Sequence, residues 1–379
     1  MQTRKTKDVE NIAYKFRIKP AEEHIVLFAK AFGCRRFMYN RMLADRSDHY
    51  KILGKDLKNE ITDYKDVYPF LNEIDALVLA NSKISIDTAF DRFFKGESKY
   101  PVFKKKTGKQ SFTTNCSNKK NPNLTYDFKT QLLKLPKIKT PIYVDQHRKI
   151  KTGGILKSAT ISKEQNGNYY VSLLYEYPKV ERIKTTGKEA IGLDMSVKNF
   201  YIDSNGNTTS YPRFYRRIED VLVKEQVKLS KMKKGSNNYK KQKKKIAKLH
   251  AKAKQQRSDF LHKLSYNLVM KYDIICIEDL NIQGMQRSLN LGKSVGDLGW
   301  NMFVSFLAYK CEKYGKTLIK VNRFFPSSKT CSNCGYIHKE LTLSDRTYEC
   351  PCCGSIIDRD HNAAINIKEE GLRLFYSNS

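Results

Sequence analysis

Three acidic residues stand where the chain could hold a divalent cation. Asp194 directly follows the apolar run 191–193, and Glu278 directly follows the apolar run 274–277. A buried carboxylate that lacks its partner costs about 3–5 kcal/mol, so acids at the ends of buried strands need basic partners or a cation. A third acidic segment, 358–360, precedes a short helical pattern. Carboxylates that converge from separate elements are the ligands that two Mg²⁺ ions, about 4 Å apart, need for phosphodiester hydrolysis.

Each acid also has an ordinary structural interpretation. A single carboxylate often forms a salt bridge or caps a helix. This interpretation is favoured for Asp358, and Asp279 is also placed to cap or to pair. Since spacing along a sequence does not show convergence in space, the residues alone leave both interpretations open.

Four cysteines form two Cys-x-x-Cys pairs. The pairs are Cys331 with Cys334 and Cys350 with Cys353, they are separated by 15 residues, and a glycine follows each pair. Four thiolates at this spacing are typical of a tetrahedral structural zinc site. A reducible disulfide pair or a redox motif is the alternative. Because four protein ligands would fill the zinc coordination, we expect the site to hold a fold rather than to catalyse. Cys352 is interpreted as a bystander.

The run 224–254 is strongly basic, with 13 lysines and one acid, Glu225. Its sparse apolar residues are compatible with a helix that packs one face and offers the other to phosphates. The alternative is a solvated helix face, which normally interleaves glutamate with lysine. The lysines predicted to contact nucleic acid are Lys233, Lys234, Lys240, Lys241 and Lys244.

Aromatic and basic residues alternate in two further segments, 100–106 and 110–114. Such segments can stack on bases and touch a nucleic-acid backbone. They are equally compatible with strand core beside a solvated edge, and the sequence leaves this open.

The composition supports a polyanionic partner. The 71 lysines and arginines exceed the 39 acids and give a formal net charge of +32, spread along the whole chain. With 40% hydrophobic residues the chain has the composition of a folded protein. We find no apolar run of the roughly 18 residues that a membrane span needs and expect no secretory signal. Nucleic acid is therefore the predicted partner.

The first half of the chain predicts a helical module inserted into an antiparallel sheet or barrel. Residues 13–18 alternate apolar and basic side chains with the period of a strand. Helix-period apolar residues follow over 20–95, and short strands punctuated by glycine and proline follow from 100 to about 177. The early strand is expected to join the later ones.

The second half predicts an α/β domain with a mixed sheet. Strands are expected at 190–194 and 199–203, a long basic helical stretch over 216–272, and a strand buried on both faces at 273–278. A helix near 297–314 and a strand at 316–321 complete the pattern.

The motifs together resemble the TnpB family, transposon-encoded RNA-guided DNA endonucleases related to the type V CRISPR effectors. The principal matching segments are Ile191-Gly192-Leu193-Asp194, Ile277-Glu278-Asp279-Leu280-Asn281, 324–335 and Asp358-Arg359-Asp360-His361-Asn362-Ala363-Ala364. Segments 32–40, 259–264 and 299–300 extend the resemblance over nearly the whole chain.

The resemblance implies a multidomain α/β and β-barrel protein. It implies an RNase H-like RuvC nuclease domain with an inserted zinc ribbon, and a wedge-type β-barrel interrupted by a helical recognition module. The implied ranges are wedge barrel 1–19 and 97–185, recognition module 20–96, RuvC nuclease 186–326 and 356–379, and zinc ribbon 327–355.

The same resemblance implies the chemistry. The catalytic, magnesium-binding acids would be Asp194, Glu278 and Asp360; Asp360 is preferred to Asp358 because the family's third acid stands two residues before the asparagine of the Asn-Ala-Ala run. The implied cofactors are two Mg²⁺ and one structural Zn²⁺. The implied partners are a guide RNA and a double-stranded DNA target with a short adjacent motif, in the nucleoid region of a prokaryotic cytoplasm.

Two departures from the family pattern limit which residue roles can be carried over from the family to this chain. Met195 and Ser196 follow the first acid, where many relatives carry a glycine, and the motif-reading segment 76–84 is variable in the family. Polar candidates for nucleic-acid contact in that segment and in the barrel are Asn81, Ser82, Lys83, Thr114 and Ser117. Competing hypotheses are an RNA-guided repressor that binds without cutting and a transposase or its accessory protein. The three intact acids favour the enzyme.

Overall fold

The computed structural model describes residues 9–55, 57, 60–117, 121–180, 187–288, 292–342 and 344–377. The chain forms two compact units, Met1–Val180 and Glu181–Ser379. Each unit is described by itself below.

The first unit is built on one antiparallel seven-stranded sheet of order β2-β6-β7-β1-β5-β4-β3. The strands are β1 (Val9–Lys19), β2 (Gln110–Asn115), β3 (Thr125–Asp127), β4 (Leu132–Lys134), β5 (Ile142–Asp145), β6 (Ile155–Lys163) and β7 (Tyr169–Pro178). Alternate residues of β7 are buried, which gives the sheet one core face. β1 pairs with both β5 and β7, with Phe16 opposite Val171. The expectation that the early strand joins the later ones is confirmed.

Four helical segments lie between β1 and β2 in the sequence: α1 (Glu22–Leu53), α2 (Ile61–Val67), the 3₁₀ segment η1 (Pro69–Glu73) and α3 (Ala76–Phe94). α1 starts with two acids in its first turn and ends at Gly54, whose φ of 64° is readily adopted by glycine. Phe28 of α1 packs on Phe112 of β2, with ring centroids 5.7 Å apart. The helical insertion therefore shares its core with the sheet.

The second unit is built on a mixed four-stranded sheet of order β11-β10-β8-β9. The strands are β8 (Ala190–Ser196), β9 (Phe200–Asp203), β10 (Ile274–Glu278) and β11 (Thr317–Val321). β8, β10 and β11 are parallel, and β9 is antiparallel to β8. The predicted α/β fold with a mixed sheet is confirmed.

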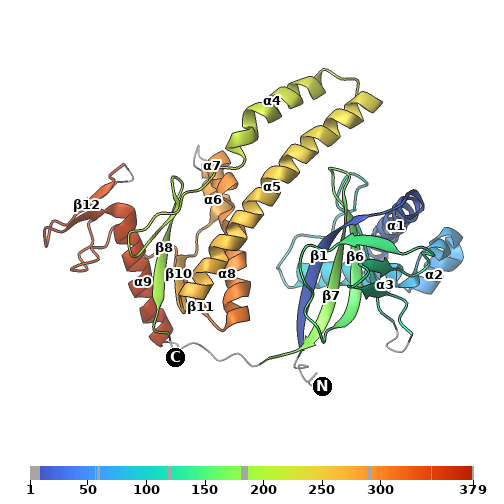
Figure 1. Ribbon diagram of the computed structural model, residues 1–379, viewed down its shortest axis with the longest axis horizontal. Coiled ribbons are helices and arrows are strands. Elements are labelled where there is room, and N and C mark those ends of the chain that lie inside the picture. Colours follow the sequence, from blue (N-terminus) through green and yellow to red (C-terminus); the bar gives the residue numbers. More distant parts are fainter. Residues whose placement is uncertain are drawn as a thin grey trace. The chain divides into compact units, whose positions relative to one another are not determined.

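Helices cover both faces of this sheet (Figure 1). Ile275 and Ile277 of β10 pack with α5 (Asn237–Lys271) and α8 (Trp300–Tyr314), whereas Ile274 and Cys276 face α9 (Arg359–Ser377). This burial on both faces explains the continuous apolar run of β10. The remaining helices are α4 (Arg216–Ser230), α6 (Ile282–Ser288) and α7 (Gly292–Leu298).

Two glycines let α9 lie directly on the strands. A Cβ atom at Gly192 would stand 2.2 Å from the carbonyl oxygen of Ala364, and one at Gly371 would stand 2.2 Å from Sγ of Cys276. Any larger residue at either position would push the helix away from the sheet.

The long helical stretch predicted over 216–272 is helical and consists of two helices, α4 and α5. The chain turns between them at Gly235, whose φ is 87°. Glu225 of α4 links the two helices. Its carboxylate accepts a hydrogen bond from Gln242 of α5 and forms an ion pair with Lys245 of α5. Figure 1 shows the two helices running side by side in opposite directions.

A small ribbon precedes α9, with β12 (Thr347–Glu349) antiparallel to β13 (Ile356–Asp358). Of the helices in the described ranges, none is long and apolar enough to cross a membrane.

Candidate active site and metal centre

The three predicted catalytic acids lie on elements that meet in the second unit. Ile277 pairs with Leu193 across the parallel strands β10 and β8, so the residues that follow, Glu278 and Asp194, lie at the same end of adjacent strands. Asp360 lies in the first turn of α9, which packs on β8 and β10. All three side chains are partly buried.

The pKa of Asp194 responds to the other two acids. Burial, and then the carboxylates of Glu278 and Asp360, raise the pKa of Asp194 well above its usual range. Burial also raises the pKa of Glu278, against the opposing hydrogen bond that the Ser327 hydroxyl donates to its Oε1. The structure therefore brings the three acids together in a partly desolvated cluster.

Within the described ranges, Arg359 is the cation that the hydrogen-bond and pKa data place beside these acids. Arg359 Nη2 donates to Asp360 Oδ1 at 3.2 Å, and Arg359 opposes the upward shift of the pKa of Asp194. Three carboxylates against one guanidinium leave negative charge in excess. Carboxylate oxygens are the ligands of hard cations such as Mg²⁺, so the donor set fits a divalent cation.

The neighbouring acids have structural roles. Asp358 Oδ1 accepts a 2.9 Å hydrogen bond from the backbone N–H of His361, so it caps α9 as expected. Asp279 pairs with Lys320 and Arg323 at 3.4 and 3.1 Å, and these partners lower its pKa. In each of the two motifs, one acid belongs to the cluster (Glu278, Asp360) and the neighbouring acid makes a structural contact (Asp279, Asp358).

Sequence reasoning missed the polar contacts that connect α9 to the segment before the ribbon. Ser327 is buried and holds Glu278, and Asn366 Nδ2 donates to the carbonyl oxygen of Ser327 at 2.8 Å. Asn362, fully buried, donates to Thr330 O and accepts from the N–H of Ser332, inside the first cysteine pair. The available signal was the spacing of Asn362 and Asn366, which places both on one face of a helix.

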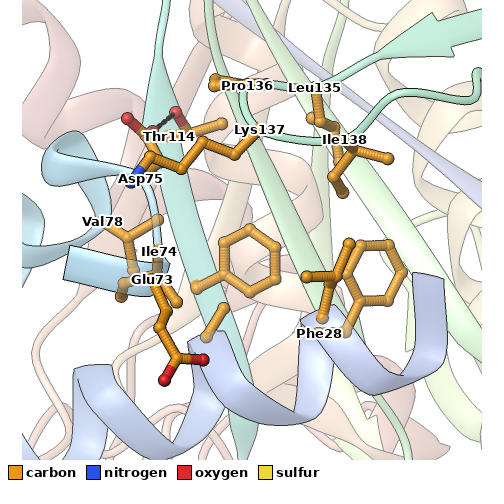
Figure 2. A pocket seen from close by; sticks show the side chains of 13 residues that line it. Phe28, Glu73, Ile74, Asp75, Val78, Thr114, Leu135, Pro136, Lys137 and Ile138 are labelled. Carbon is orange, nitrogen blue, oxygen red and sulfur yellow. Dashed lines mark hydrogen bonds between the residues drawn. The ribbon is translucent and has the colours of Figure 1, made fainter. Parts of the chain in front are cut away.

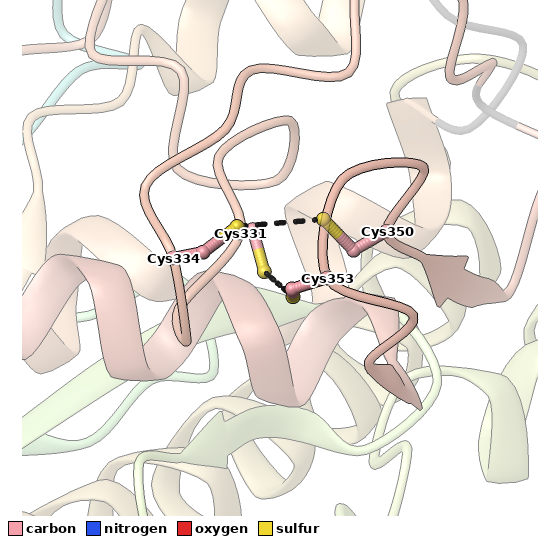
Figure 3. A group of neighbouring side chains, drawn as sticks. All are labelled: Cys331, Cys334, Cys350 and Cys353. Carbon is pink, nitrogen blue, oxygen red and sulfur yellow. Dashed lines mark hydrogen bonds between the residues drawn. The ribbon is translucent and has the colours of Figure 1, made fainter.

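The four predicted zinc ligands converge (Figure 3). Sulfur atoms of Cys331, Cys334, Cys350 and Cys353 all lie within 4.8 Å of one another. Cys331 and Cys353 are 3.7 Å apart and Cys334 and Cys350 are 3.6 Å apart, too far for disulfides. A tetrahedral zinc with bonds of about 2.3 Å has sulfur–sulfur edges of about 3.8 Å, so the cluster fits zinc.

The cysteine cluster holds a ribbon that has little core of its own. Tyr348 is fully buried and donates to the carbonyl oxygens of Lys329 and Tyr336, and Leu341 packs with it beside Cys331 and Cys350. So small a core needs a further stabilising element such as a metal. Cys352 is exposed and stands outside the cluster, as its interpretation as a bystander predicts.

The donor atoms of the three acids lie farther apart than those of the four cysteines. In the described ranges, the cysteine quartet is the only group of three or more potential ligands whose donor atoms approach within 4.8 Å of one another. The carboxylates repel, and a cation between them would draw them together.

Known proteins match the chain along its length. Family models match residues 172–289 ("Probable transposase", OrfB of IS605), 300–367 ("Cas12f1-like, TNB domain") and 10–55 ("Helix-turn-helix domain"). A Streptomyces pristinaespiralis protein named "Putative RNA-guided DNA endonuclease" is 33% identical over 370 residues, covering 95% of this chain and 89% of its own. The chain belongs to the TnpB family. InsQ of Escherichia coli K12, with the same designation, is 26% identical over 95% of this chain and 92% of its own.

The fold is shared beyond the TnpB family. The Cas12f1 chain from a cryo-EM structure of a Cas12f1-sgRNA-target DNA complex superposes with a TM-score of 0.60 at 14% identity, covering 96% of this chain and 99% of that one. At that identity the likeness concerns the fold. One family description differs from the structure: the segment matched as a helix-turn-helix is a strand, β1, followed by one long helix, α1.

Two of the five polar candidates in the first unit are buried. Ser82 is fully buried and donates to the carbonyl oxygen of Val78. Thr114 is 1% exposed and donates to Asp75 beside a cavity of about 40 Å³ (Figure 2). The expectation that these two hydroxyls face a ligand does not fit this structure, because both are used in internal hydrogen bonds.

The other three candidates are more accessible. Asn81 Nδ2 donates to Thr113 O and Asn115 Oδ1, Lys83 pairs with Glu60 at 2.8 Å, and Ser117 is exposed. The five predicted lysines of the α4–α5 hairpin are all exposed, and no acid of the described ranges pairs with them: Lys233, Lys234, Lys240, Lys241 and Lys244. Their contact with nucleic acid stays a prediction.

Proposed function

We propose that this protein is an RNA-guided DNA endonuclease encoded by a transposon, with Asp194, Glu278 and Asp360 as its catalytic acids. The observation that carries the proposal is the cluster of three partly desolvated carboxylates with an excess of negative charge. The names of the family relatives and the RNA and DNA in the Cas12f1 complex supply the substrate class.

Two Mg²⁺ ions held by these three acids would supply an activated water and neutralise charge on the scissile phosphate. The protein's own residues arrange the ligands. Ser327 orients the carboxylate of Glu278 through its hydroxyl, Asn366 holds Ser327, and Arg359 orients Asp360. The four clustered cysteines would hold one structural Zn²⁺. The hydrogen bond from Ser332 to Asn362 would then fix the ribbon against the start of α9.

The remaining expectations belong to the same proposal. The guide RNA and the DNA target would lie against the lysine-rich α4–α5 hairpin and the first unit, since phosphate contacts position a nucleic acid without reading its sequence. The six domain ranges given above and a nucleoid-associated place in a prokaryotic cytoplasm follow from the family.

The deciding experiment compares the full chain with its Asp194→Ala variant after each is purified with the RNA it binds. We expect a discrete co-purifying RNA with a variable end, Mg²⁺-dependent cutting of matched DNA by the parent chain, and loss of cutting with DNA binding retained in the variant. Cutting that survives Asp194→Ala would contradict the assigned centre. Guided binding by a parent chain that never cuts would favour the repressor.

A further inference from the structure

A small hollow in the first unit is lined mainly by cations. It lies where α1 meets the segment that leads into β2, and its volume is about 20 Å³. Five of its eight lining residues are basic, and no acid lines it. The basic residues are Arg35, Arg36, Lys104, Lys105 and Lys109.

In the part of the chain that the structure describes, no acid compensates the charge of these cations. In the described ranges none of the five forms an ion pair, and the buried Arg35 Nε has no hydrogen-bond partner. Burial lowers the pKa of Arg35. Burial and the charge of Arg35 together lower the pKa of Lys104 to about 8. A folded protein seldom keeps like charges partly desolvated and side by side unless an anion joins them.

Hydrogen bonds hold the cations in place. Arg35 Nη1 donates to the carbonyl oxygen of Ser111 at 2.8 Å. Asn40 fixes the backbone of Lys104 from both sides, by donating to its carbonyl oxygen at 3.0 Å and accepting from its N–H at 2.8 Å. Lys104 Nζ also stands 3.3 Å from the centre of the Tyr39 ring. The charges therefore cannot separate without the loss of these contacts.

The hollow matches the non-bridging oxygens of a phosphate group in size and charge. A volume of about 20 Å³ admits one or two water-sized groups. Guanidinium and ammonium groups attract phosphate oxygens through charge-assisted contacts, and the exposed Lys105 and Lys109 add charge at the rim. Gln110 accepts from Arg36 and donates to Lys106 O, which shapes the loop around the opening.

We propose that this hollow binds one backbone phosphate of a nucleic acid. The presence of an anion site rests on the geometry above, whereas the choice of nucleic acid as its source rests on the proposed function. The two segments that line the hollow, 32–40 and 100–114, are separated in the sequence by α2 and α3. The hollow therefore forms only when the helical insertion packs on the sheet.

The test measures equilibrium binding of the full chain to labelled single-stranded RNA and to labelled DNA over a range of salt concentrations. Arg35→Gln and Lys104→Gln should each weaken binding about tenfold and lower the salt slope by about one phosphate. Lys106→Gln is the matched control, because Lys106 is exposed in the same loop and does not line the hollow. If the control weakens binding as much as the two test variants, the proposal is wrong.

A second arm identifies the source of the phosphate. Methylphosphonate linkages, which lack the charge, are introduced one at a time into the RNA and into the DNA. At one position, a methylphosphonate linkage should weaken binding to the parent chain but not to the Arg35→Gln variant. The strand that carries this position is the one whose phosphate binds in the hollow. If no such linkage exists in either strand, and inorganic phosphate raises the melting temperature of both chains equally, the hollow is not a phosphate seat.

These measurements are separable from the proposed function. All of them are made in the Asp194→Ala background, so that loss of cleavage plays no part. If Arg35→Gln does not fold, the exposed pair Lys105→Gln and Lys109→Gln replaces it with the same expected change in salt slope. If the variant with both Lys105→Gln and Lys109→Gln has the same salt slope as the parent chain, the proposed phosphate site is wrong. Guided cleavage by the parent chain would then still support the proposed function.

Discussion

The acid cluster of the second unit and the cation hollow of the first are opposite in charge but similar in construction. In each, a partly buried residue has like charges as neighbours: Asp194 has Glu278 and Asp360, and Lys104 has Arg35. In each, hydrogen bonds from a neighbouring element stop the charges from moving apart. Like charges held together in this way favour counterions, and we propose a divalent cation at the acids and a phosphate at the hollow.

Two acids of the second unit have charged or polar partners instead. Glu225 meets Gln242 and Lys245, which lower its pKa to about 2, and Asp273 meets Lys316 at 2.6 Å. At these two acids, unlike at the acid cluster, an adjacent cation balances the negative charge. The first and last of the four predictions below test this difference in charge pairing, and the other two test the elements that hold the second unit's sites.

The largest effect is expected at the Glu278–Asp279 dipeptide. Glu278→Gln keeps the shape of the side chain but removes a charged ligand, so cleavage should fall about a thousandfold or more. Asp279→Asn removes an exposed, paired carboxylate and should change cleavage less than threefold. Rates are measured on one matched DNA under single-turnover conditions. Equal losses in the two variants would show that burial and pairing do not identify the catalytic acid.

The next effect concerns the cysteines. Cys353→Ser should abolish binding of the single zinc and expose the ribbon to protease, because the ribbon core is too small to fold without metal. Cys352→Ser, one position away and exposed, should keep the full zinc content. Elemental analysis and limited proteolysis give the answer. Full zinc content in Cys353→Ser would remove that residue from the ligand set.

A smaller effect is expected from the contact between α9 and β8. Gly192→Ala places a methyl group against Ala364 O and should cost about 1–3 kcal/mol while moving the helix that carries Asp360. Gly33→Ala, in the middle of α1 with open space around it, should instead stabilise the chain by about 0.5–1 kcal/mol. Calorimetric melting of the two variants should shift in opposite directions, and a Gly192→Ala variant as stable as the parent would disprove the close contact.

The smallest effect concerns the paired acid. Because the hydrogen bonds from Gln242 and Lys245 lower the pKa of Glu225 to about 2, its contribution to stability is present above the unfolded-state pKa of about 4.3 and is lost as pH falls toward 2. Glu225→Gln should therefore melt below the parent chain at pH 7 and together with it near pH 2. A melting difference that stays constant with pH would mean that the charge of Glu225 plays no part.

The local features of the sequence predicted much of this structure. Apolar runs ending in acid located β8 and β10, the cysteine spacing predicted the quartet, and helix-period residues located the insertion between β1 and β2. These signals succeed because strand burial, ligand spacing and helical periodicity are all written in neighbouring residues.

The predictions that did not fit depended on which way a side chain faces. Ser82 of α3 and Thr114 of β2 are polar residues predicted from the sequence to contact nucleic acid. Both are buried where these elements pack on the rest of the first unit. The basic stretch 216–272 is helical as predicted, and the tertiary structure adds the reversal at Gly235 that makes it a hairpin. Such outcomes depend on long-range packing that periodicity does not encode.

By itself, the sequence determined the types of chemistry available: three acids, four thiolates, a large excess of lysine and the elements that carry them. The tertiary structure alone decided which charges go uncompensated. It brought Asp194, Glu278 and Asp360 together, gave Asp279 and Asp358 ordinary partners, and closed Arg35 and Lys104 around one hollow. The physical reason is that charge compensation depends on distance and desolvation in space, and residues far apart in the sequence set both.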